Sequence, residues 1–141
     1  MDVVSNICRY ILTIKDRGTR FLVSTPIPHK KAMTVRDAFV PSWCIYFGTP
    51  RVVVSDNVKE FSNHLMTDTF KQLGVDHRFV PPYSSQANGF IELQHKTINQ
   101  ALRTVDTKTN WARRLPLIVA SINNTSIEGS PHTPSQYTIG I

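Results

Sequence analysis

Cysteine is scarce in this sequence, which has two such residues, Cys8 and Cys44, among 141. Two cysteines without metal-type spacing exclude a disulfide framework and a CxxC zinc site. Long apolar runs are also missing. Residues 52–54 and 117–120 form typical runs, far short of the ~20 residues of a membrane span. No charged start followed by an apolar stretch marks a signal peptide. These absences favour a protein of a reducing compartment, with no membrane partner.

Acidic residues are outnumbered by basic ones. Lys and Arg total 16 and Asp and Glu total 10, which gives a formal net charge of +6. Such an excess suits a polyanion such as nucleic acid, although charge alone identifies no partner. Hydrophobic residues make up 40% and charged residues 18%, so the composition is that of a globular and not a disordered chain. No repeat or long linker divides it, and we expect one domain over residues 1–141.

Apolar periodicity predicts an α/β fold. The first two strands, 10–14 and 21–25, should form an antiparallel hairpin that turns at residues 16–18 and ends at Pro26. The apolar run 51–55 predicts a buried, parallel strand, and residues 75–80 predict another. Residues 2–4 are a further strand fragment. Strands followed by helix–strand alternation imply one mixed central sheet with helices on both faces.

Four longer segments have helical spacing, namely residues 30–47, 61–73, 90–105 and 110–123, and Pro134 opens a short final helix. Pro41 interrupts the first of them and predicts a kink or a break, because proline lacks the amide proton of an interior helical residue. Trp43 and Trp111 fall at core positions of their helices. The polar residues 84–89 predict a loop.

Three carboxylates are candidate functional residues because of their positions on the predicted elements. Asp2 lies in the first strand fragment, Asp56 directly follows the strand 51–55, and Glu92 lies near the start of the helix 90–105. Ligands of α/β sheets usually bind at the carboxyl ends of strands, where Asp56 is expected. Taken singly, an Asp after a strand is more often a turn or cap residue, and a Glu near a helix start usually complements the helix dipole.

Several motifs occur together and in order. Residues 9–20 read RYILTIKDRGTR, residues 39–50 contain FVPSW and FGTP, residues 55–61 read SDNVKEF, and residues 82–92 read PYSSQANGFIE. They resemble RYLLTIVDRFTR, FVxxWxxxFGxP, SDxGxxF and PYHPQxNGxxE of the catalytic core of retroviral and gypsy-type LTR-retrotransposon integrases. The resemblance runs from Asp2 to about Gly140. The 35 residues between Asp56 and Glu92 match the family's spacing of its second and third acids.

This resemblance implies an RNase H-like fold and a catalytic, metal-binding triad of Asp2, Asp56 and Glu92. Three carboxylates suit Mg²⁺ or Mn²⁺, and two such ions can stabilise both ends of an in-line displacement at phosphorus. The implied reactions are DNA 3′-end processing and strand transfer. Asp16 is a rival first acid, but only 39 residues separate it from Asp56, whereas 53 separate Asp2 from Asp56. We expect Asp16 to start a turn.

The resemblance also places residues near DNA. Tyr83, Gln86, Asn88 and Lys96 are the candidate DNA-binding residues, in a loop and on the following helix. Lys96 lies one helical turn after Glu92, where it can neutralise phosphate or simply pair with the glutamate. The implied partners are element ends, target DNA and further copies of the chain, in a nuclear or other intracellular setting.

Some residues depart from the family pattern. Val58 replaces a glycine, Leu93 replaces an arginine, and residues 84–85 replace a His-Pro pair. The strand fragment at residues 2–4, which corresponds to a central strand of the family's sheet, is short here. These departures suit a second hypothesis, a catalytically inactive integrase-derived module that binds DNA or a partner. A nuclease for RNA–DNA hybrids is a third, against which the spacing of Asp56 and Glu92 argues.

Overall fold

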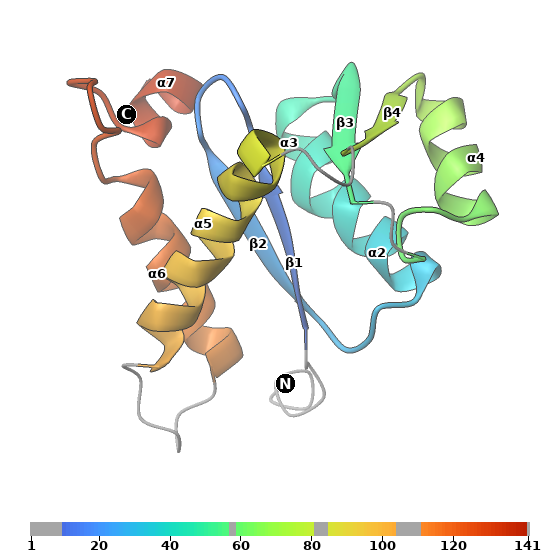
Figure 1. The fold of residues 1–141 in the computed structure, drawn as a ribbon, viewed down its shortest axis with the longest axis horizontal. Helices are drawn as coiled ribbons and strands as arrows, with labels where there is room; N and C mark the ends of the chain where they lie inside the picture. The colour runs from blue at the N-terminus through green and yellow to red at the C-terminus, as the bar shows by residue number, and fades with distance from the viewer. Residues whose placement is uncertain (1–9, 57–58, 81–84, 104–110, 141) are drawn as a thin grey trace.

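The computed structural model describes residues 10–56, 59–80, 85–103 and 111–140, and for residues 85–92 it describes the main chain alone. Along these ranges two strands come first, helical segments then alternate with β3 and β4, and helices follow, as predicted (Figure 1). The elements are β1 (Tyr10–Lys15), β2 (Leu22–Ile27), α2 (Ala32–Phe39), η1 (Val40–Cys44), α3 (Ile45–Phe47), β3 (Val52–Ser55), α4 (His64–Leu73), β4 (Asp76–Phe79), α5 (Ser85–Arg103), α6 (Trp111–Asn123) and α7 (Pro134–Ile139).

The predicted hairpin of β1 and β2 is confirmed. The strands pair antiparallel, from Tyr10 opposite Ile27 to Lys15 opposite Leu22. The prediction that Pro26 ends the second strand is wrong. The Asp16 amide donates to the Phe21 carbonyl at 2.9 Å, and hydrogen-bonded pairs alternate along the ladder from that point. Pro26 therefore falls at a position that donates nothing to β1, and its missing amide proton leaves the ladder intact.

The described strands form two sheets of two strands each, so the predicted mixed sheet is not continuous within the described residues. β1 pairs with β2, and β3 pairs parallel with β4, as the sequence indicated for residues 51–55. A continuous sheet needs a hydrogen-bonded strand between these pairs, and none of the described residues supplies it. The predicted fragment at residues 2–4 lies outside the described residues. Val52 is 41% exposed, Val53 and Val54 are half-buried, and only Ser55 of β3 is buried, so the prediction of a buried strand is wrong for its three valines.

The first core joins the two sheets. Side chains from β1, β2, α2, η1 and α4 form one buried cluster, and Val53 of β3 packs against it. Trp43 lies in this cluster, as predicted. Both sheets thus bury a face against the same helices. Its fully or nearly buried members are Leu12, Ile27, Val35, Phe39, Trp43, Met66, Phe70 and Val75.

The second core lies on the opposite face of the hairpin. Leu22 of β2, Ile98 of α5 and Leu115 of α6 are buried against one another, and Trp111 packs on them as predicted. Successive side chains of a strand point to opposite faces, so β2 serves both cores. Figure 1 shows α5 and α6 on one side of β1 and β2 and α2 on the other. The prediction of helices on both faces is confirmed for this sheet.

The helix around Pro41 changes its winding instead of ending. α2 passes into the π-helical turn η1, and α3 follows. At the end of η1 the Ile45 amide donates to the Val40 carbonyl, five residues back. The wider turn accommodates the proline ring, which would clash with a carbonyl in a regular α-helix. The predicted interruption is therefore confirmed, in the form of a π-turn. Within the described residues, no helix is both long enough and apolar enough to cross a bilayer.

Candidate active site

Asp56 lies at the carboxyl end of β3. Three valines in a row favour the strand, because β-branched side chains suit extended backbone, and the strand stops at Ser55. The Asp56 side chain is exposed. Among the described residues, no hydrogen bond or ion pair engages its carboxylate, so its oxygens remain available to a ligand.

The main chain beside Asp56 is held more firmly than its side chain. The Val80 amide donates to the Ser55 carbonyl at 2.9 Å and extends the β3–β4 ladder to the end of both strands. The buried Ser55 hydroxyl donates to the Asp56 carbonyl at 3.2 Å and lies 2.6 Å from Nε2 of His77. Burial lowers the pKa of His77. Ser55 at the end of β3 and His77 of β4 therefore form a small polar network next to the exposed carboxylate of Asp56.

His77 is not evident as a site residue from the sequence alone. Nothing in the linear sequence joins residue 77 to Ser55. The strand register provides the signal, because Val53 opposes His77 and Ser55 opposes Phe79, so Ser55 and His77 share a face of two adjacent strands.

Glu92 lies in α5, but the course of its side chain is outside the described part of the chain. Gln86 and Asn88 also lie in α5, so the prediction of a loop over residues 84–89 is wrong from Ser85 onward. The asparagine and glycine in this stretch favour a turn in isolation, and the amphipathic helix that follows extends backward through them. Lys96 is exposed on α5. Gln94, two residues earlier, is buried, so one side of α5 packs against the protein here and another is exposed.

Two predicted site residues, Asp2 and Tyr83, lie outside the described residues. The structure thus neither joins nor separates the three carboxylates. Within the described ranges, no group of three His, Cys, Asp or Glu residues is arranged to hold a metal ion, and Asp56 is the one member of the predicted triad whose side chain falls in them. An exposed, unpaired carboxylate is a donor that suits Mg²⁺ or Mn²⁺. The Asp56 side chain therefore has the chemistry of a ligand for either ion.

Asp16 has the structural role predicted for it. One oxygen of its carboxylate accepts hydrogen bonds from the Thr19 amide and the Thr19 hydroxyl, each at 2.8 Å. This is an Asx-type turn that closes the hairpin between β1 and β2. Its carboxylate is therefore committed to the turn, in contrast to that of Asp56.

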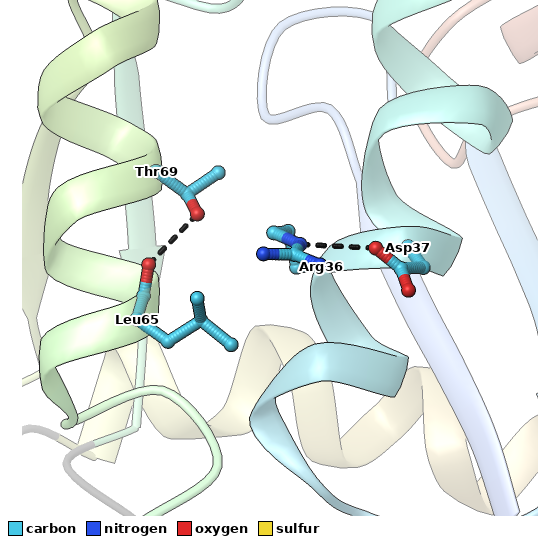
Figure 2. A network of polar contacts seen from close by, with 4 residues as sticks. All are labelled: Arg36, Asp37, Leu65 and Thr69. Carbon is cyan, nitrogen blue, oxygen red and sulfur yellow. Dashed lines mark hydrogen bonds and ion pairs between the residues drawn. The ribbon is translucent and has the colours of Figure 1, made fainter.

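A shallow hollow of about 470 Å³ lies between α2–η1 and α4. Figure 2 shows the Arg36–Asp37 ion pair, at 2.9 Å, facing the helix on which the Thr69 hydroxyl donates to the Leu65 carbonyl. The ion pair joins neighbouring residues and is partly exposed, so it contributes little stability. None of the predicted catalytic or DNA-binding residues lines this hollow, and we do not assign the site to it. Its lining is Arg36, Asp37, Val40, Pro41, Thr69, Gln72 and Leu73.

Comparison with protein families matches residues 1–85 to the integrase core domain. The chain is 29% identical over 133 residues to a retrovirus-related Pol polyprotein from transposon 412 of Drosophila melanogaster, covering 93% of this chain and 11% of that protein. It is 28% identical over 120 residues to the Gag-Pol polyprotein of koala retrovirus, covering 83% and 7%. It is 28% identical over 141 residues to the Pro-Pol polyprotein of simian foamy virus type 3, covering 97% and 12%. The chain thus spans about a tenth of the length of these relatives.

Two solved structures share the fold. The catalytic core domain of BIV integrase superposes with a TM-score of 0.73 at 24% identity, covering 92% of this chain and 84% of that one. A chain of the simian T-cell lymphotropic virus intasome, solved in complex with a PP2A regulatory subunit, superposes with a TM-score of 0.83 at 14% identity, covering 92% and 48%. These likenesses confirm the predicted RNase H-like α/β fold.

Proposed function

The chain belongs to the integrase core domain family, and from this premise we propose that it is a metal-dependent polynucleotidyl transferase core. The proposed reactions are DNA 3′-end processing and strand transfer, and Asp2, Asp56 and Glu92 are the proposed catalytic residues. The observation that carries the proposal is the state of Asp56. Its carboxylate is exposed at the end of β3 and has no partner among the described residues, while the adjacent main chain is held by Ser55 and Val80.

The proposed carboxylates would hold one or two Mg²⁺ or Mn²⁺ ions through oxygen donors. Such ions, when bound, stabilise negative charge on the attacking and leaving oxygens of a phosphodiester. The Asp56 carboxylate can bind an ion without first breaking another contact, because no described residue is bonded to its oxygens. Its cost of desolvation is small, because the carboxylate is already at the surface.

The remaining candidate residues would bind DNA. Lys96 is exposed on α5, the helix that also contains Glu92, and its ammonium can neutralise a backbone phosphate. We assign Tyr83 to base stacking, and Gln86 and Asn88 to hydrogen bonds with the nucleotide near the reacting phosphate. The net charge of +6 favours association with DNA over the whole surface.

The proposed partners are the DNA ends of an element, target DNA and further copies of this chain. We propose that residues 1–141 act as one catalytic core domain and that it works where DNA is accessible, in the nucleus or elsewhere inside the cell. Self-association is testable by light scattering or analytical ultracentrifugation with and without DNA. A monomer under both conditions would remove this part of the proposal.

A disintegration or end-nicking assay with Mn²⁺ tests the activity. We expect product from the wild-type protein, loss of product in Asp56→Asn and Glu92→Gln, and retained product in Asp76→Asn. Asp76 is a matched control, because its exposed carboxylate pairs with Arg78 on β4 and has no proposed role.

The same proteins separate the activity from the inactive-module hypothesis. That hypothesis predicts no product from any of them, together with salt-sensitive DNA binding that Asp56→Asn leaves unchanged. A substrate of RNA–DNA hybrid in a parallel reaction tests the remaining alternative. Cleavage confined to the hybrid would replace the proposed function.

A further inference from the structure

Behind Asp56, three polar groups lie in a row: the His77 imidazole, the Ser55 hydroxyl and the Asp56 main-chain carbonyl. Nε2 of His77 is 2.6 Å from the Ser55 Oγ, and this Oγ is 3.2 Å from the carbonyl oxygen of Asp56. The row links β4 to the residue that ends β3. It is a built contact between two strands and not a feature of an exposed loop, because Ser55 is buried.

The single proton of the Ser55 hydroxyl sets the direction of this row. A carbonyl oxygen can only accept, so the hydroxyl donates to Asp56. With its proton directed to Asp56, the hydroxyl accepts from His77, and this assignment places the ring proton on Nε2. Burial lowers the pKa of His77, so the ring is neutral near pH 7 and carries one N–H. The network therefore assigns the Nε2–H tautomer to His77.

The His77 ring is itself held by aromatic neighbours. Its centroid lies 4.5 Å from that of Phe70 on α4 and 4.5 Å from that of Phe79 on β4. Phe70 in turn makes an edge contact with Phe39 of α2, at 5.6 Å between centroids. The donor that reaches Ser55 is thus anchored in the first core.

The Asp56 carboxylate depends on this support for its direction. No described side chain or main-chain group binds its oxygens, so the main chain at residue 56 sets where they point. Two carbonyls in succession are fixed there, that of Ser55 by the Val80 amide and that of Asp56 by the Ser55 hydroxyl. Without the hydroxyl, the second of these carbonyls loses its described donor.

We propose that His77 is a positioning residue that acts through Ser55 to fix the main chain of Asp56 and thereby aim its carboxylate. This inference rests on the proposed function, in which Asp56 is catalytic. His77 itself touches neither DNA nor metal. Its contribution is to hold the carboxylate in a productive direction before the substrate binds.

The first test uses the disintegration assay across a series of Mn²⁺ concentrations. Ser55→Ala and His77→Phe each remove one link, and His77→Phe keeps a ring between Phe70 and Phe79. We expect each to lower the rate about fivefold to tenfold, the factor of one ordinary hydrogen bond, and to raise the Mn²⁺ concentration at half-maximal rate. Ser55→Thr and His77→Gln keep a hydroxyl and an N–H donor, and they should recover most of the rate.

The control is Arg78→Gln. Arg78 neighbours His77 on β4, points to the other face and pairs with Asp76 at the surface. Its rate and Mn²⁺ dependence should equal those of the wild type. Thermal unfolding of every variant identifies any that fails to fold. If His77→Phe does not fold, the rate of Ser55→Ala, which is the smaller change, decides the test.

The second test needs no activity. The ¹⁵N shifts of the His77 ring at neutral pH should show a protonated Nε2, and Ser55→Ala should shift the Asp56 amide resonance more than Arg78→Gln does. A proton on Nδ1 would reverse the row and overturn the inference. Absence of wild-type product, with both NMR results as expected, would overturn the proposed function and leave the positioning contact standing. If the wild type gives product and Ser55→Ala and His77→Phe react at the full rate, the positioning inference is overturned and the proposed function stands.

Discussion

Asn123 at the end of α6 is bonded twice to the main chain of Leu22 in β2, 101 residues earlier in the sequence. The Leu22 amide donates to Oδ1 at 2.9 Å, and Nδ2 donates to the Leu22 carbonyl at 2.8 Å. Leu22 occupies a position whose main-chain groups point away from β1. The Asn123 side chain therefore satisfies the open edge of β2 as a neighbouring strand would, and it does so in a buried setting.

Replacing Asn123 with leucine should destabilise the fold. The substitution keeps the volume but leaves the buried amide and carbonyl of Leu22 without partners, at a cost of about 1–3 kcal/mol for each. Chemical denaturation should show a lower free energy of unfolding for Asn123→Leu and little change for Asn124→Leu, whose side chain is exposed. Equal stabilities would mean that the edge of β2 is satisfied in some other way.

The second core should be sensitive to cavities. Leu115 is fully buried between β2 and α5, whereas Leu117 on the same helix is 66% exposed. We expect Leu115→Ala to lower the free energy of unfolding by about 2–5 kcal/mol and Leu117→Ala to change it by less than about 0.5 kcal/mol. Similar losses for both variants, measured by denaturation, would contradict the packing of α6 against the hairpin.

Gly74 ends α4 in the left-handed conformation, with φ +71. An added Cβ meets no atom within 4 Å there, so the penalty of a substitution comes from the backbone. Gly74→Ala should destabilise the protein by about 1–2 kcal/mol. Gly18→Ala is the comparison, since its φ is not positive and its Cβ would make an ordinary contact with Asp16. A shift in melting temperature for Gly18→Ala as large as that for Gly74→Ala would argue against this helix end.

Acidification should weaken the fold through His77. Burial lowers its pKa from the ordinary value of 6.5, so below that value the unfolded chain takes up a proton before the folded chain does. Proton uptake by the unfolded state favours unfolding, and the free energy of unfolding should fall as the pH drops through 6.5. His77→Gln removes the effect and should give a shallower dependence on pH. Parallel curves for the two proteins would contradict the burial of this ring.

The sequence predicted the local elements well because their determinants are local. Gly74 ends α4, Pro134 opens α7, and Asp16 closes the hairpin turn, each through its own backbone or capping chemistry. Pro41 changed the helix as expected. Pro26 did not end its strand, because its effect depends on the ladder position, which is set by pairing with β1 and not by the residues around it.

The site was less accessible to sequence reasoning. Asp56 could be placed at a strand end from its apolar run and its spacing to Glu92. The Ser55–His77 contact could not, because it arises from the parallel register of β3 and β4. The bond from Asn123 to Leu22 was hidden for the same reason, since it joins distant segments through tertiary packing.

Whether Asp56 is a catalytic carboxylate is decided by the disintegration assay in Mn²⁺ on wild type, Asp56→Asn and Asp76→Asn. We expect product from the wild type and from Asp76→Asn, and none from Asp56→Asn at equal fold stability and equal DNA binding. Undiminished product from a correctly folded Asp56→Asn protein would contradict this catalytic role.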